Sequence, residues 1–91
     1  MNVDDDRLLN KIAIPKLPLR TPEEVEEIRK EMLKWYKTYL WVTCRDYSII
    51  LGFMNNNYDR QHGWDDAMIR NAPITHNRSG YFLDLPTPIK F

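Results

Sequence analysis

The segment Thr21-Pro22-Glu23-Glu24 is the strongest constraint on how this chain folds. Thr21 is a good helix N-cap, proline fits the first helical position, and Glu24 stands three residues after the cap, where a capping box places it. The two glutamates also favour the positive end of the helix dipole. We therefore expect an α-helix to begin at residue 22.

The apolar pattern after this start keeps a helical spacing as far as residue 54. On a helical wheel of about 100° per residue, the polar residues fall in one arc and the apolar residues form two adjacent stripes. The second stripe passes Arg45 and Asp46 without a change of phase, and its members are Leu33, Tyr36, Leu40, Cys44, Tyr47, Leu51 and Met54. The pattern predicts one long amphipathic helix over residues 22–54, with room for a kink near residues 43–46.

The stretch 39–53 leaves a second interpretation open, because it contains residues that disfavour helix. A hairpin here would turn at Arg45-Asp46, although neither residue is the Gly or Asn that a tight hairpin turn needs for positive φ. The helix-disfavouring residues are the β-branched Val42, Thr43, Ile49 and Ile50, together with Gly52. The alternative fold is α+β, with strands that form a hairpin at 39–53.

Segments stiffened by proline flank the predicted helix. Pro15 and Pro18 exclude a helix interior and a central strand, and Pro86 and Pro88 impose an extended conformation near the C-terminus. A short helix is expected over residues 64–72, a loop over 55–63 and another short helix over 3–11. The fold class we predict is mainly α: one small domain over residues 1–91, with an N-terminal arm (1–20), a helical body (21–72) and a C-terminal arm (73–91).

Composition argues against several classes of protein. The chain has 13 basic and 13 acidic residues, without the Lys/Arg cluster that nonspecific binding to nucleic acid needs. One cysteine cannot close an internal disulfide. The apolar run Ile49–Leu51 is far shorter than the ~20 residues of a transmembrane helix. The acidic start MNVDDDR does not resemble a signal peptide or a mitochondrial presequence, so we expect an intracellular protein.

Few residues suggest catalysis or ligand binding. Cys44 would lie in the middle of a helix among apolar residues, far from any group that lowers a thiol pKa. His62 and His76 are the only histidines, and with Cys44 they show no close metal-ligand spacing. The aspartates between residues 59 and 66 lack the alternation and the glycine of a calcium loop. We expect no catalytic residue, no cofactor, no metal and no small-molecule substrate.

Two residues depart from the helical pattern. Trp41 falls within the charged arc, and tryptophan is enriched in binding hot spots. Asp46 falls on the apolar side, where a buried carboxylate needs a partner. Each also has an ordinary explanation, because Trp41 could contact the C-terminal arm of its own chain and a bend could bring Asp46 to water.

The predicted helix is too long and too apolar for so short a chain to cover. Residues 22–54 would span about 50 Å at 1.5 Å per residue, and a large uncovered apolar face marks an interface. We expect a non-catalytic protein–protein interaction protein, either a small accessory subunit of a larger assembly or a helical self-associating protein. The residues expected to contact other subunits or a second copy are Trp41, Asp46, Ile12, Ile14, Leu17, Leu19, Phe82, Leu85, Ile89 and Phe91.

Two other functions stay open at this level. A small virus-type regulator that binds and blocks a host enzyme fits the size and the neutral charge of the chain. A small enzyme that uses Cys44 as nucleophile would need His62 or His76 to fold back onto the thiol and act as its base.

Overall fold

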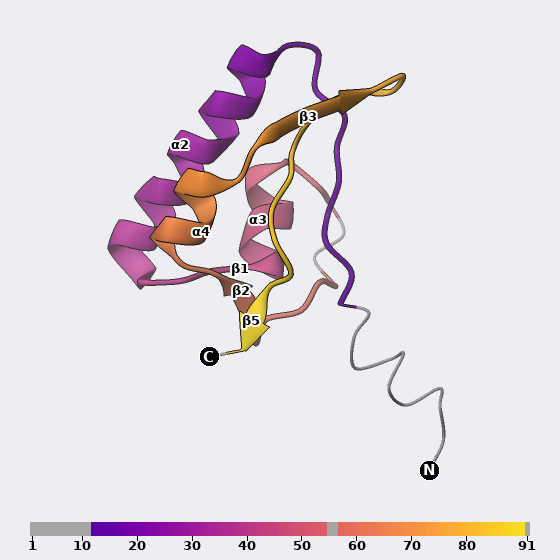
Figure 1. Cartoon of the computed structure of the whole chain (residues 1–91). Helices are drawn as coiled ribbons and strands as arrows, with labels where there is room; N and C mark the ends of the chain where they lie inside the picture. The colour runs from indigo at the N-terminus through magenta and orange to yellow at the C-terminus, as the bar shows by residue number, and fades with distance from the viewer. Residues whose placement is uncertain (1–11, 55–56, 91) are drawn as a thin grey trace.

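The computed structural model describes residues 12–54 and 57–90, and Figure 1 shows the arrangement of their elements. The elements follow in the order α2 (Pro22–Tyr39), β1 (Val42–Thr43), α3 (Cys44–Ile50), β2 (His62–Trp64), α4 (Asp66–Asn71), β3 (Ile74–Asn77), β4 (Gly80–Leu83) and β5 (Ile89–Lys90). Two antiparallel sheets form, one in the order β1-β2-β5 and one from the β3-β4 hairpin. The fold is therefore α+β, and the mainly α prediction is wrong. The helix predicted over 3–11 lies outside the described residues.

The predicted single helix over 22–54 is wrong because the helix stops just before Leu40. It starts as predicted, since Thr21 Oγ1 accepts a hydrogen bond from the Glu24 amide at 3.2 Å. Leu40 then has φ 66°, in the left-handed region, and donates its amide to the Tyr36 carbonyl at 2.7 Å. A residue in this conformation directs the chain out of the helix. The helical wheel does not reveal the stop, because leucine rarely occupies this conformation.

A capping box starts α3 independently of α2, whose predicted box is not closed because the Glu24 carboxylate accepts from the Arg20 amide at 2.8 Å instead of from Thr21. Thr43 Oγ1 accepts from the Asp46 amide at 3.0 Å, and Asp46 Oδ2 accepts from the Thr43 amide at 3.1 Å. The alternative prediction was right to mix helix with strand, but the hairpin at 39–53 is wrong. Within that stretch β1 is followed by a helix, and its partner β2 lies much later in the chain.

The three-stranded sheet joins the middle of the chain to its C-terminus. Gly63 in β2 pairs with Thr43 of β1 on one side and with Ile89 of β5 on the other. A Cβ atom at residue 63 would collide with the backbone of Val42 and Thr43. Glycine at this position therefore allows β1 and β2 to approach closely.

The second half of the chain carries more strand than the sequence predicts. The loop expected over 55–63 ends in β2, and the helix expected over 64–72 is the shorter α4, which Asp65 caps. The expected extended arm over 73–91 contains the β3-β4 hairpin and β5. The prolines correctly indicate an extended backbone. They do not indicate which strands pair, because strand pairing is not specified by local composition.

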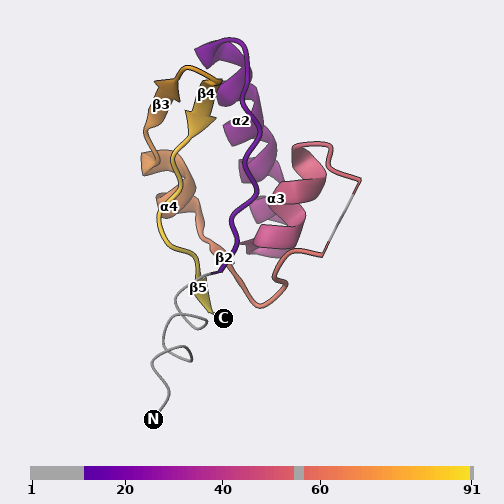
Figure 2. The same cartoon turned by 90° about the vertical axis from the view of Figure 1, so that its right-hand side faces the viewer.

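Residues 12–20 run beside β4, on the side away from β3 (Figure 2). Leu19 and Tyr81 exchange two backbone hydrogen bonds of 2.9 Å each. Pro15 is fully buried. The N-terminal segment therefore packs on the body of its own chain, and its prolines favour the extended path that this packing needs.

The core lies between α2, α3, α4 and the two sheets. Trp64 anchors it, because its ring meets Tyr47 edge to face with centroids 5.6 Å apart and its Nε1 donates to the Pro86 carbonyl at 2.7 Å. The buried apolar residues are Val25, Met32, Val42, Cys44, Tyr47, Leu51, Trp64, Ile69, Ala72, Leu83 and Leu85. Among the described residues, no helix has the length and apolar character needed to cross a membrane.

Candidate protein-binding site

The end of α2 brings aromatic side chains to the surface. Trp35 and Tyr39 lie one helical turn apart, and their rings meet edge to face with centroids 5.9 Å apart. Tyr39 and Leu40 are each 66% exposed. Because Leu40 turns the chain out of the helix, Trp41 follows in an extended segment rather than on the charged face of a helix.

Trp35, Tyr39 and Trp41 line a depression of about 430 Å³ that we call the aromatic hollow. Its volume falls within the range of sites that accept a small ligand or an anchoring side chain. Trp35 Nε1 donates to Glu31 Oε2 at 3.2 Å, which helps to orient this ring. The wall of the hollow is formed by Trp35, Tyr39, Trp41, Thr43, Arg45, Asp46 and Ile49.

Two opposite charges belong to the wall of the hollow. Asp46 is held by the capping box of α3, and the Arg45 amide donates to the Asp59 carbonyl at 3.0 Å, so the backbone below the hollow is fixed. Arg45 Nε is buried and has no hydrogen-bond partner among the described residues. A buried donor without an acceptor costs about 1–3 kcal/mol. The hollow thus combines apolar walls with one cation and one carboxylate.

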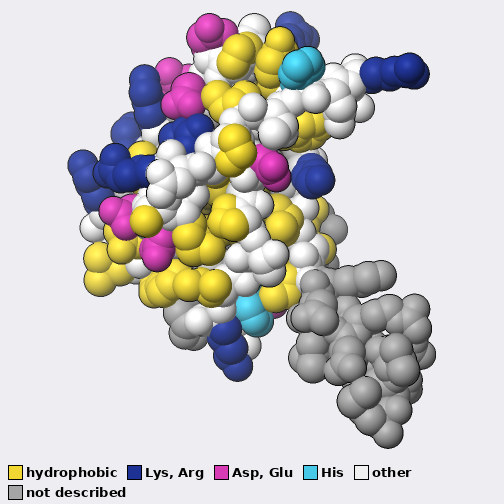
Figure 3. All heavy atoms as spheres, in the orientation of Figure 1, with side chains coloured by type: hydrophobic (Ala, Val, Ile, Leu, Met, Phe, Trp, Pro, Cys, Tyr) yellow, Lys and Arg dark blue, Asp and Glu magenta, His cyan; other side chains and the backbone are white. Residues whose placement is uncertain are grey.

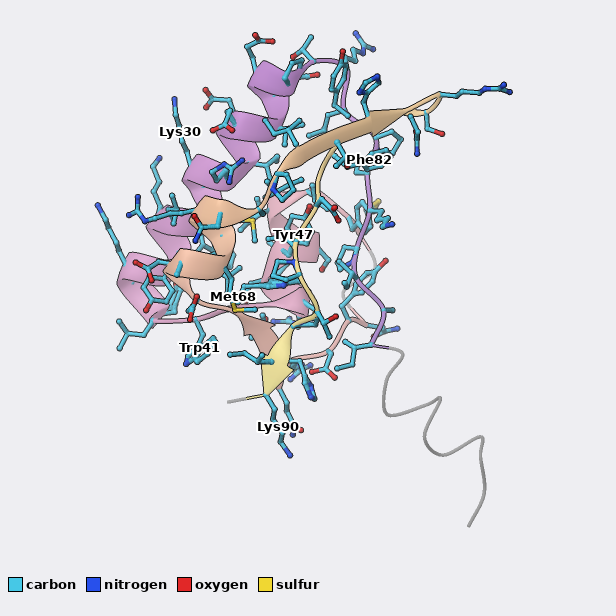
Figure 4. The ribbon with its side chains drawn as sticks, viewed as in Figure 1. Lys30, Trp41, Tyr47, Met68, Phe82 and Lys90 are labelled. Atoms are coloured by element: carbon cyan, nitrogen blue, oxygen red, sulfur yellow. The ribbon has the colours of Figure 1, made fainter. Side chains whose placement is uncertain are left out.

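Figure 3 shows that hydrophobic side chains gather on the lower part of one face, from the end of α2 across α4. In Figure 4, Trp41 and Met68 both lie in this region. Met68 belongs to a second depression of about 440 Å³, which we call the α4 groove. The α4 groove is lined by Ala67, Met68, Asn71, Ala72, Pro73, Asp84, Leu85 and Pro86.

The structure brings two of the residues predicted to bind partners, Trp41 and Asp46, into the aromatic hollow. The reasons given by the helical wheel do not hold for them, because neither belongs to a continuous helix over 22–54. Asp46 is a capping residue of α3 and accepts the Thr43 amide, so it is not a carboxylate buried on an apolar face.

The other residues predicted to bind partners lie elsewhere. A smaller cavity of about 220 Å³ brings Ile14 of the N-terminal arm together with Phe82 and Leu85 of the C-terminal arm. Ile89 in β5 is 44% exposed, and Phe91 lies outside the described residues. The partly buried residues of the N-terminal arm that pack against the core are Ile12, Ile14, Leu17 and Leu19. Internal packing is therefore sufficient to explain why these arm residues are apolar.

Tyr39 and Leu40, both largely exposed beside Trp41, are not among the residues that the sequence predicts to bind partners. Both were placed on apolar stripes of the predicted helix, where they would pack inward. A local signal was present, because the segment 35–41, WYKTYLW, contains four aromatic residues. Such density exceeds what one face of a short helix can bury.

Cys44 does not have the properties of a nucleophile. The thiol is fully buried, and burial, with the Asp59 carboxylate as a second cause, raises the pKa of Cys44 to about 12. The thiolate needed for nucleophilic attack is therefore negligible at neutral pH.

Asp59 and His62 form an acid–base pair, because Asp59 Oδ1 and His62 Nδ1 are 3.0 Å apart. Burial opposes ionisation of Asp59, but hydrogen bonds from His62 and from the Gln61 amide outweigh it and lower the pKa of this carboxyl. The same Oδ1 accepts the amides of Gln61 and His62, so the pair closes a loop before β2. No group of three or more His, Cys, Asp or Glu side chains in residues 12–54 and 57–90 could hold a metal ion.

Comparison with protein families, with curated proteins and with solved structures gives no match to this chain.

Proposed function

We propose that this chain is a non-catalytic protein–protein interaction protein, a small accessory subunit that docks on its partner through the aromatic hollow. The observation that carries the proposal is the exposure of Tyr39 and Leu40, each 66%, beside a depression walled by Trp35 and Trp41. Tryptophan and tyrosine are enriched among the residues that dominate binding energies. A surface of this kind is best explained by a partner that covers it.

The exposed residues that support this proposal differ from the uncovered helix face on which the sequence-based prediction of an interface depended. The uncovered face of a long helix does not exist, because α2 ends at Tyr39. The proposed interface lies instead at the junction between α2 and α3, where Leu40 ends the first helix and the capping box of Thr43 starts the second. The aromatic hollow is formed by this break, since its wall takes residues from both helices.

The polar groups of the hollow favour a protein partner. Arg45 and Asp46 add opposite charges to an otherwise apolar wall, and charged groups at the rim of an interface select the partner and its orientation. A partner that inserts an apolar side chain into the hollow, and places an acidic group near Arg45 and a basic group near Asp46, would complement this surface. The same surface would also serve a regulator that blocks an enzyme, and the lifetime of the complex separates that role from a subunit's.

Affinity capture with matched variants tests the proposal. Tyr39→Lys places a charge on the hollow, and lysine suits the end of a helix, so folding is preserved. Met54→Lys is the control, because Met54 is 99% exposed and does not line the hollow. We expect the wild type and Met54→Lys to retain the same proteins from native lysate. Tyr39→Lys should retain at least ~10-fold less of them. Equal retention by all three chains would contradict the proposal.

A further inference from the structure

The β3-β4 hairpin presents an open edge. Within the described residues β3 pairs with β4 alone, and β4 is bridged on its other side by Leu19. Figure 2 shows β3 at the outer margin, with β4 between it and the N-terminal segment. Residues 75–77 are exposed. An exposed strand edge offers free backbone donors and acceptors to another strand.

The register of the hairpin shows which backbone groups point outward. Tyr81 exchanges its backbone hydrogen bonds with Leu19, so its N–H and C=O face away from β3. His76 lies opposite Tyr81 and therefore directs its own N–H and C=O away from β4. Ile74 does the same, because groups alternate along a strand and the neighbouring Pro73 carbonyl accepts from the Asp84 amide at 2.8 Å.

We propose that β3 pairs antiparallel with β3 of a second copy of this chain, about a two-fold axis at Thr75. The backbone N–H and C=O groups that point outward belong to Ile74 and His76, which lie on either side of Thr75. When two copies of β3 pair antiparallel with the two Thr75 residues opposite each other, Ile74 of one copy therefore lies opposite His76 of the other. Each Ile74 then exchanges two backbone hydrogen bonds with the partner's His76. The two Thr75 residues face each other as a non-hydrogen-bonded pair, in which threonine pairs are favourable.

The residues along the edge of β3 permit pairing with a second copy. The strand lacks the lysine, proline or bulge that commonly protects an exposed edge. Pro73 stands just before it, opposite the partner's Asn77, where neither residue directs backbone groups across the new interface. Pro73 also lines the α4 groove, so the partner's hairpin turn would approach the rim of that groove. This surface does not include the aromatic hollow and does not rest on the function proposed for it.

Disulfide trapping tests the register. Opposed residues of a non-hydrogen-bonded pair have Cα atoms about 4.5 Å apart, within the range that a disulfide spans. Thr75→Cys should cross-link into dimers under mild oxidation, whereas Thr87→Cys, exposed and outside β3, should stay monomeric at the same concentration. Cys44 is fully buried and does not interfere. Equal cross-linking of the two variants would overturn the proposal.

Charge exchange at the same position gives a second, independent test. Thr75→Lys and Thr75→Glu each place like charges directly opposite each other and should remain monomeric, while an equimolar mixture should form heterodimers. Sedimentation of the separate and mixed variants, with unfolding curves as a folding control, measures this. Separate variants that dimerise as the wild type does would contradict the two-fold at Thr75.

Proline at His76 tests the backbone bonds themselves. His76→Pro removes an N–H that points outward, so the hairpin bonds to β4 survive, whereas His76→Thr loses the same ring and keeps the donor. We expect the proline variant to raise the dimer dissociation constant at least ~10-fold over the threonine variant. A wild-type chain that stays monomeric up to ~1 mM would overturn the proposal, because even a weak interface is populated there.

Discussion

The two halves of residues 22–54 share one apolar periodicity and fold differently. The first half is α2, in which Val25 and Met32 are buried while charged residues pair on the surface, as Lys30 does with Glu27 at 3.7 Å. The second half turns at Leu40 and continues as strand and short helix. Periodicity therefore identifies which residues are apolar enough for the core, whereas caps and chain turns decide how many helices carry them.

The two halves fold differently because β1 separates their helices. β1 pairs with β2 at Gly63, where only glycine leaves room for the backbone of β1. Gly63→Ala should have the largest effect, since its Cβ would meet the backbone of Val42 and Thr43 rather than a movable side chain. We expect a loss of at least ~4 kcal/mol, enough to unfold much of a chain of this size. Chemical denaturation measures it.

Gly52→Ala is the matched control for that substitution. Gly52 has φ 86°, but no atom lies within 4 Å of a Cβ placed there. Only the strained backbone conformation contributes, so we expect a loss of about 1 kcal/mol. If both variants were equally stable, close approach of β1 and β2 would not be what positions the second half.

The halves also differ in the ionisable groups that they bury. Burial raises the pKa of Tyr47 from 10.0 to about 12, and burial, with Asp59 as a second cause, raises the pKa of Cys44 from 9.0 to about 12. The folded state therefore keeps protons that the unfolded chain releases. Stability is full below pH 9 and falls as pH rises toward 12, by about 1.4 kcal/mol per pH unit for each group while it titrates only in the unfolded chain.

Urea denaturation from pH 8 to pH 11 measures this dependence on pH. Cys44→Ala should flatten the fall that begins near pH 9, and Tyr47→Phe should flatten the part that begins near pH 10. A slope unchanged by both substitutions would contradict the assignment of the alkaline transition to the α3 core.

How much of the fold was predictable follows from where each signal lies in the chain. The start of α2 was predicted because Thr21 and Glu24 carry the whole capping signal within four residues. The stop at Leu40 was not, because a left-handed leucine is imposed by the tertiary fold. The pairing of β1 with β2 and β5 joins segments far apart in sequence, so local patterns could not predict it.

The candidate site was predictable only in part, for the same reason. Trp41 and Asp46 stood out as exceptions to a helical pattern, and both line the aromatic hollow. Tyr39 and Leu40 were hidden by that pattern, because they fit the apolar stripes and only the turn at Leu40 exposes them. Exceptions to a periodic pattern were thus more informative about the site than its regular members.

The two N-caps offer a smaller and more direct comparison of the halves. Thr43→Ala removes a cap that is partly buried and reciprocated by Asp46, so we expect a loss of about 1–2 kcal/mol. Thr21→Ala removes an exposed cap and should cost about 0.5–1 kcal/mol. Thermal unfolding ranks the two. Thr43→Ser keeps the acceptor and should recover most of the loss, and a failure to recover would show that packing of the methyl group dominates.

Replacement of Leu40 by glycine should have an effect as small as the loss of the Thr21 cap, but of the opposite sign. A non-glycine residue at φ 66° stores backbone strain, and Leu40 is 66% exposed, so its side chain contributes little to the core. Leu40→Gly should therefore stabilise the chain by about 0.5–1 kcal/mol, less any apolar contact it loses. Leu40→Ala is the control, because it shortens the side chain and keeps the strain.

The same pair of variants separates stability from function. If a partner covers the aromatic hollow together with the exposed Leu40, Leu40→Gly should fold more stably than the wild type and still bind less, because the strained leucine is retained for contact rather than for folding. Both Leu40→Gly and Leu40→Ala should then lose binding to a similar degree, while only Leu40→Gly raises the unfolding midpoint. A glycine variant that is more stable and binds as well as the wild type would show that the leucine side chain contributes neither to binding nor to stability. The left-handed turn would then serve only to direct the chain into β1.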